Sequence, residues 1–296
     1  MPVRYSPPLW ETSWSRAETL LSETPLKLPT LTFKALAFGI CLALAAAVSA
    51  SAWAGNQPKG QVDADYAVYL KGFHVLNAHA SYQIEPWGYG GSTQIKPAGL
   101  ISWFVTMDVT SRVQGRFTPD GNVQPVLFDS GGISRGKHRH VRLEFSDDTP
   151  KVTDLQPPES DREPVPDSSL PHTVDTLSGM AHLLHSLETT GKCNGSQIIF
   201  DGIRLSEMVV HGPVTADIPR EQREFYSGPG LRCDFVGRQL AGFIKDSPNR
   251  AKLAAPQPGS VWFYRIDGLG LVPVRIEFSH PKLGRVTVVM QHAVNR

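Results

Sequence analysis

Three histidines, His172, His182 and His185, lie close together and are the first candidates for chemistry in this sequence. Two histidines spaced by three residues share one side of a helix, where they can bind zinc if a third ligand converges. Neither His182 nor His185 falls on the apolar stripe of the helix expected there, and no H-E-x-x-H pattern is present. We therefore expect solvent-facing or partly buried histidines and no metal ligand.

Ser134 and Lys137 match the S-x-x-K pattern, in which one helical turn brings a lysine amine to a serine nucleophile. Gly136 lies inside the pattern and no K-T-G follows, so we expect a loop and assign no catalytic residue. The basic run from Lys137 to His140 could bind a phosphate or a lipid headgroup, and a solvated strand end is the alternative. Asp201 and Arg204 could pair as carboxylate and guanidinium, but turn geometry explains Asp201 better.

Aromatic side chains gather in the segment from Val261 to Ile266, which is apolar on both faces. A strand of this kind is covered on both sides. A helix packed on one face explains the pattern, and an aromatic-lined cavity that accepts an apolar ligand is the alternative. We take Trp103, Trp262 and Tyr264 as the residues that would line such a cavity.

The elements that must position these residues are mostly strands. Apolar residues alternate with polar ones in 101–109, 141–145, 274–278 and 286–290, which is typical of half-buried antiparallel strands. Roughly a dozen such strands are expected. The fold class is therefore mainly β: a single antiparallel sheet, curved into a half-open barrel or spiral, with one main helix at about residues 176–188 packed on it.

Turn and cap residues support this arrangement. Asp201-Gly202 and Asp120-Gly121 each separate two apolar runs and predict hairpins. Asp175 predicts the N-cap of the helix, and Gly191 predicts its end. A weaker helical turn is expected over 238–245. The Pro-rich stretch 150–171 predicts a surface loop inside one domain rather than a linker between two.

The N-terminal region has the pattern of an export signal. The uncharged run from Ala35 to Ala50 follows Lys27 and Lys34 and leads to Ala52-Trp53-Ala54, which predicts cleavage between Ala54 and Gly55. The alternative is a membrane anchor, but the run is short for one. We expect residues 1–54 to be an N-terminal extension and signal peptide, and residues 55–296 to be a single β-rich periplasmic domain.

Cys193 and Cys233 are the two cysteines that remain after cleavage. An even number of cysteines in an exported chain predicts a disulfide, and two free buried thiols are the alternative. The CxxC spacing of redox enzymes and zinc knuckles is absent from the pair. The net charge of +1 gives no reason to expect nucleic acid as a partner. No cofactor is expected.

Several short stretches occur in an order that is similar to a known family: 173–178, 200–204, 226–228, 241–243 and 271–275. Together they resemble the exported bacterial family catalogued as domain of unknown function 3108, over nearly the whole chain from Tyr66. The resemblance implies a signal-bearing protein of mostly antiparallel β structure with no established activity. Such domains look similar to the half-open barrels of lipoprotein carriers, which is fold analogy alone.

From these observations we expect a non-enzymatic exported envelope protein. It would bind an apolar ligand, such as a lipid, or an envelope protein, and support envelope integrity. The alternative is an envelope hydrolase whose site is assembled only in the fold, which requires a serine or cysteine within hydrogen-bond reach of a histidine.

Overall fold

The computed structural model describes residues 60–134, 136–220 and 226–296. The predicted signal segment and its cleavage site at Ala54 and Gly55 lie outside these residues. The strands of the described chain are β1 (Val62–Leu70), β2 (Phe73–Glu85), β3 (Gly88–Pro97), β4 (Met107–Phe117), β5 (Val123–Ser134), β6 (Lys137–Ser146), β7 (Thr149–Gln156), β8 (Gly195–Phe200), β9 (Leu205–Ile218), β10 (Gly228–Ala241), β11 (Gln257–Ile266), β12 (Gly270–His280) and β13 (Gly284–Asn295). The helices are α1 (Thr176–Thr190), the short α2 (Arg250–Ala254), and the 3-10 turns η1 (Gly99–Trp103) and η2 (Asp167–Ser169).

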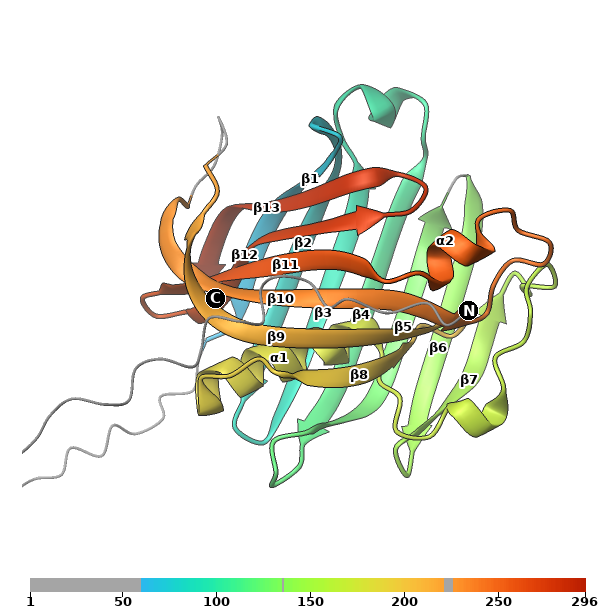
Figure 1. The fold of residues 1–296 in the computed structure, drawn as a ribbon, viewed down its shortest axis with the longest axis horizontal. Coiled ribbons are helices and arrows are strands. Elements are labelled where there is room, and N and C mark those ends of the chain that lie inside the picture. Colours follow the sequence, from blue (N-terminus) through green and yellow to red (C-terminus); the bar gives the residue numbers. More distant parts are fainter. Residues whose placement is uncertain (1–59, 135, 221–225) are drawn as a thin grey trace, which may run out of the picture. The chain divides into compact units, whose positions relative to one another are not determined.

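All thirteen strands belong to one antiparallel sheet, in the order β7-β6-β5-β4-β3-β2-β1-β13-β12-β11-β10-β9-β8. The sheet is open, with β7 and β8 as its two edges. Figure 1 shows that the sheet folds over on itself, so that β8–β13 pass in front of β3–β7 and run across them. Consecutive strands are neighbours in the sheet except β7 and β8, which form its two edges, and the pairing of β1 with β13 joins the two halves of the sheet. This confirms the predicted mainly β fold with one main helix.

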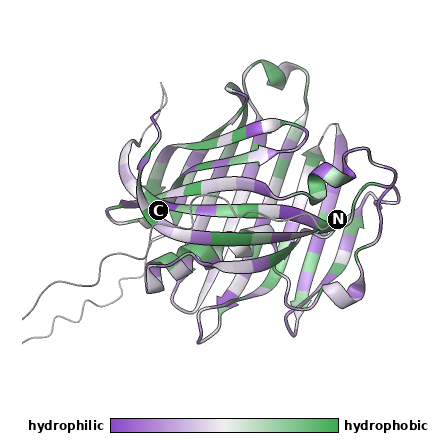
Figure 2. Cartoon of the chain, in the orientation of Figure 1, coloured by the Kyte–Doolittle hydropathy of each residue, from purple (hydrophilic) through white to green (hydrophobic). Residues whose placement is uncertain are grey.

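The core fills the space that the folded sheet encloses. One cluster joins β1 to β11, β12 and β13 and includes Tyr66, Trp262 and Met290. A second cluster packs Leu184 and Leu187 of α1 against Phe263. A third lies where β8 and β9 meet β5 and β6 and includes Phe128, Leu143, Phe200 and Leu205. The hydropathy colouring shows the resulting alternation along the strands (Figure 2).

Helix α1 begins and ends where its cap residues predict. The Asp175 carboxylate accepts hydrogen bonds from the backbone N–H groups of Leu177 and Ser178, and Gly191 ends the helix with a left-handed φ of 68°. A residue with a Cβ is strained in that conformation, which is why glycine is favoured there. The helix contacts β4, β5, β8 and β12 and thus lies against both halves of the sheet. No helix among the described residues is long and apolar enough to cross a membrane.

Three predicted elements are corrected. The chain over 98–106 is a loop containing η1, and β4 starts only at Met107. Pro97 lacks an N–H donor and Gly99 has a φ of 58°, so the chain leaves the ladder there despite its alternating pattern. Residues 150–156 of the Pro-rich stretch belong to β7, an edge strand, where proline is tolerated. Residues 238–241 continue β10, because they pair with β9, and form no helical turn.

Candidate functional site

A hollow lies between α1 and one face of strands β8–β12. Its volume is about 500 Å³. Polar and apolar residues both line it, but most of its surface is apolar and comes from side chains such as Met180 and Leu183 of α1, Met208 of β9, Phe235 of β10, Val261 of β11 and Ile276 of β12. We call this hollow the α1 cavity. Its size lies within the range of ordinary small-molecule sites.

The register of the strands explains why these residues share one face. Val210 lies opposite Phe235, Cys233 opposite Val261, and Val261 opposite Ile276. Directly paired residues in an antiparallel sheet point to the same side. The alternating apolar residues of four strands therefore meet on one surface, and α1 covers one end of it.

The side of helix α1 that faces away from the α1 cavity packs against strands β3 and β4. Leu177 and Ala181 pack with Tyr89 and Val113 of β3 and β4. His185 is buried and its ring stacks on Phe117, with ring centroids 3.7 Å apart. The helix is thus anchored to β3 and β4, which leaves Met180 and Leu183 to form the wall of the α1 cavity.

A buried hydrogen-bond chain fixes the start of α1. The Tyr89 hydroxyl donates to Ser178 Oγ at 2.7 Å, and Ser178 Oγ donates to Asp175 Oδ2 at 2.5 Å. Burial raises the pKa of Asp175, an effect that its hydrogen bonds from Ser178 and Leu177 oppose. Tyr89, Ser178 and Asp175 thus all have hydrogen-bond partners, which a buried polar network requires in order to stabilise a fold.

Polar groups stand at the edges of the α1 cavity. His182 contacts Gln197 of β8 at 2.5 Å, and burial lowers the pKa of His182. Burial also lowers the pKa of His280, and the positive charges of Lys282 and Arg204 lower it further. Lys282 and Arg204 are therefore the positive groups that act on the His280 imidazole at this edge.

Two ion pairs border the same cavity. Arg204 donates from Nε and Nη2 to Asp201 Oδ2, and the backbone N–H groups of Ile203 and Arg204 donate to Oδ1. Asp201 thus combines the turn role and the ion pair that the sequence left as alternatives. Arg238 pairs with Glu207 at 2.7 Å. Both arginines are about half exposed and can exchange these partners for a ligand group.

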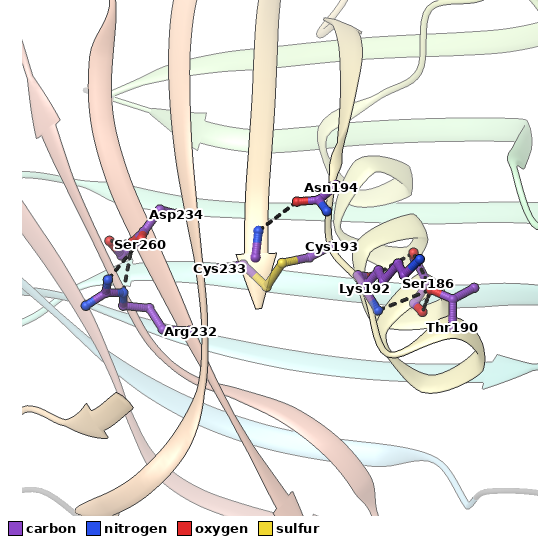
Figure 3. Close-up of a disulfide and its surroundings, with 10 residues drawn as sticks. Ser186, Thr190, Lys192, Cys193, Asn194, Arg232, Cys233, Asp234 and Ser260 are labelled. Carbon is purple, nitrogen blue, oxygen red and sulfur yellow. Dashed lines mark hydrogen bonds and ion pairs between the residues drawn. A yellow bond between two sulfur atoms is a disulfide. The ribbon is translucent and has the colours of Figure 1, made fainter. Parts of the chain in front are cut away.

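A disulfide joins Cys193 to Cys233, with Cα atoms 6.3 Å apart (Figure 3). Cys193 precedes β8 and Cys233 lies in β10, so the disulfide crosses β9. Gly212 of β9 lies beneath it: a Cβ there would be 3.2 Å from Cys193 Sγ and 3.0 Å from the Arg232 carbonyl oxygen. Asn194 accepts a hydrogen bond from Gly212 N at 2.8 Å. The predicted disulfide is confirmed, and it forms part of the cavity wall.

The three aromatic residues singled out from the sequence lie elsewhere. Trp262 and Tyr264 join the cluster of β1 and β13, and neither lines the α1 cavity. Val261, from the opposite face of the same strand, does line it. Trp103 is 78% exposed in η1, at the end of the sheet. The structure therefore assigns the cavity wall to the Val261 face, and Trp262 to the core.

The residues considered for catalysis or metal binding do not converge. His182 faces the cavity, whereas His185 faces Phe117, and His172 precedes the helix. Among the described residues, no group of three His, Cys, Asp or Glu side chains could hold a metal ion. Ser134 ends β5 and Lys137 begins β6, and the two residues pair with each other, so they do not share a helical turn.

The sequence reasoning missed Met208, Phe235 and Ile276 as cavity residues. Their strands were found from their alternation, and that alternation already divides each strand into two faces. Which face meets a helix depends on pairings between residues far apart in the chain, such as Met208 with Gly237 and Ile276 with Val261.

Comparisons with known proteins agree with the family resemblance. No curated protein matches the sequence. Among solved structures, a beta-barrel-like protein of domain of unknown function DUF1849 from Brucella abortus is 13% identical, with a TM-score of 0.45, over 80% of this chain and 98% of that one. A Bacteroides fragilis protein with a YmcC-like fold is 10% identical, with a TM-score of 0.32, over 80% of this chain and 96% of that one. The family of proteins of unknown function DUF3108 matches residues 65–291, and because this match spans most of the sequence, the chain belongs to that family.

Proposed function

We propose that this chain is a non-enzymatic exported protein of the cell envelope that binds a single-chain amphiphile in the α1 cavity. The observation that carries the proposal is the cavity itself, with about 500 Å³ of space between α1 and strands β8–β12. Apolar surface that stays open inside a folded protein is typical of ligand sites. The predicted signal segment and the disulfide support export.

The distribution of polar groups indicates the class of ligand. Met180, Val210 and Ile276 offer apolar surface within the cavity, where a hydrocarbon chain would be desolvated. Lys282 and Arg204 lie near His280 at one edge, and an anionic headgroup there would meet Lys282 and compete with Asp201 for the half-exposed Arg204. A fatty acid has both features.

The alternative of a hydrolase has less support. A nucleophile needs a base within hydrogen-bond reach. His182 bonds to Gln197, and His140 to Asp129 and Asp154, rather than to a hydroxyl or thiol. Both described cysteines are joined in the disulfide.

The test is binding of cis-parinaric acid, a fluorescent fatty acid, to wild type and to two tryptophan variants. Met208→Trp fills the cavity from β9, whereas Val236→Trp places the same bulk on the exposed face of the neighbouring strand β10. We expect Met208→Trp to weaken binding at least tenfold and Val236→Trp to leave it within twofold of wild type. Absence of saturable binding to the wild type, or equal effects of both variants, would overturn the proposal.

A further inference from the structure

Four turns of the chain lie side by side at one end of the sheet. They connect β12 to β13, β1 to β2, β3 to β4 and β5 to β6. Backbone hydrogen bonds link each turn to the next: Lys71 N to Arg285 O (3.1 Å), Ala98 N to Val75 O (2.9 Å) and Gly136 N to Thr106 O (3.3 Å). We call residues 280–285, 71–74, 98–106 and 136–137 together the turn surface.

The turn surface exposes large apolar side chains. Phe73 is 75% exposed, Leu100 73% and Phe104 83%, close to the value for Trp103. Figure 2 shows the η1 loop as a hydrophobic segment projecting beyond the strands. Exposed aromatic groups that cluster in this way mark an interaction site rather than ordinary surface.

The charges of the turn surface have one sign. Its four segments contain no aspartate or glutamate. The ammonium groups of Lys71, Lys137 and Lys282 have no ion-pair partner among the described residues. At the opposite end of the strands the signs reverse: the turns 85–88, 118–122, 147–148 and 267–269 contain five acids and no lysine or arginine.

We propose that the turn surface docks on the surface of an anionic lipid bilayer, with Trp103, Phe104 and Phe73 entering the interface. Tryptophan is favoured at the boundary between headgroups and acyl chains, because its ring is apolar and its N–H can stay hydrated. Lysines beside it are attracted to anionic headgroups. The apolar residues lie in adjacent turns that backbone hydrogen bonds join, and each of them is at least 73% exposed, so a bilayer surface can reach them together.

This inference rests on the exposed aromatic residues of the turn surface, which do not line the α1 cavity, although the segment 280–285 borders both. Its test is co-sedimentation of the protein, purified as it accumulates in cells, with vesicles of equal parts phosphatidylglycerol and phosphatidylethanolamine. We expect binding that weakens as salt is raised, because screening shortens the reach of the lysine charges. Vesicles of phosphatidylcholine alone should bind at least tenfold more weakly.

The chain offers a matched control for the aromatic residues. Trp87 is 71% exposed, but lies in the turn between β2 and β3, at the acidic end. We expect Trp103→Ala/Phe104→Ala to lower vesicle partitioning at least tenfold and Trp87→Ala to leave it within twofold. Brominated lipids should quench tryptophan fluorescence of wild type, and Trp103→Phe should remove that quenching while retaining partitioning.

Three outcomes would overturn the proposal: no partitioning of wild type into anionic vesicles, an equal loss with Trp87→Ala, or no loss with Trp103→Ala/Phe104→Ala. All replaced side chains are exposed, so the variants should fold, and thermal unfolding checks this. The double variant should still bind cis-parinaric acid, and Met208→Trp should still bind vesicles. Failure of one proposal is thereby distinguished from failure of the other.

Discussion

Tyr89 and Ser178 are joined by a hydrogen bond of 2.7 Å that ties strand β3 to the first turn of helix α1. The Ser178 hydroxyl in turn donates a hydrogen bond to Asp175, the N-cap of the helix. The wall of the α1 cavity formed by Met180 and Leu183 is therefore positioned from outside the cavity, by residues that do not line it.

Two variants that break this series of hydrogen bonds should lower the free energy of unfolding by different amounts. Tyr89→Phe deletes one buried hydrogen bond and should cost about 1 kcal/mol. Asp175→Ala removes both backbone caps and leaves Ser178 without its acceptor, so it should cost about 2 kcal/mol or more. Urea unfolding measures both values. Tyr69→Phe, at a half-buried tyrosine in β1, is the control, and a cost equal to that of Tyr89→Phe would contradict the role of the hydrogen bond.

Gly212 should be the glycine most sensitive to substitution near the disulfide. Its φ is 123°, and an added Cβ would crowd Cys193 Sγ and the Arg232 carbonyl. Gly191 also has a positive φ, of 68°, but open space around it. Gly212→Ala should therefore cost at least about 1 kcal/mol more than Gly191→Ala, because strain and overpacking add. Non-reducing peptide mapping should show less Cys193–Cys233 disulfide in Gly212→Ala only. Equal stability of the two variants would contradict the claim that a Cβ at position 212 is crowded by its neighbours.

Local patterns predicted much of this fold for identifiable reasons. Alternation found β6, β12 and β13, because a half-buried strand repeats every two residues. Asp175 and Gly191 marked the ends of α1 because their cap geometry is local. Where local and non-local signals conflicted, prediction failed. Residues 238–241 contain a glycine-flanked helical pattern, but pairing with β9 holds them in β10.

The candidate site was less predictable than the fold. The strand 261–266 was expected to be covered on both faces, and it is: Phe263 packs against Leu184 and Leu187 of α1, while Trp262 packs toward β1 and β13. Its pattern could not show which face adjoins empty space. That depends on how α1 rests on β3 and β4, a contact between residues separated by about ninety positions, such as Tyr89 and Ser178.

Trp262 should behave as a core residue. It is 6% exposed and packs with Tyr66, Val272 and Met290. Trp262→Ala should lower the free energy of unfolding by about 3 to 5 kcal/mol, the usual cost of emptying a large buried site. Below the unfolding transition the variant should bind cis-parinaric acid within a few-fold of wild type. Loss of probe binding with unchanged stability would instead place Trp262 in the ligand site.

His140 should make stability depend on pH through its two carboxylate partners. Its Nδ1 lies 2.6 Å from Asp154 Oδ2 and its Nε2 lies 3.2 Å from Asp129 Oδ2, which also pairs with Arg142. The hydrogen bond to Asp154 is the main cause that raises the pKa of His140 above 6.5, and burial opposes it. A raised folded-state pKa means that this contribution is complete below about pH 6.5 and is lost as pH rises through the folded-state pKa.

The measurement is the slope of the unfolding free energy between pH 6 and pH 8, for wild type and two variants. His140→Gln should remove a contribution that falls with pH, so the slope becomes more positive by a fraction of a kcal/mol per pH unit, since solvent screens a partly exposed pair. His182 has the opposite sign, because burial lowers its pKa and its contribution is lost as pH falls. His182→Gln should therefore make the slope more negative. Slope changes of the same sign in both variants would contradict the assignment of His140 to a carboxylate pair and of His182 to a buried, neutral position beside the α1 cavity.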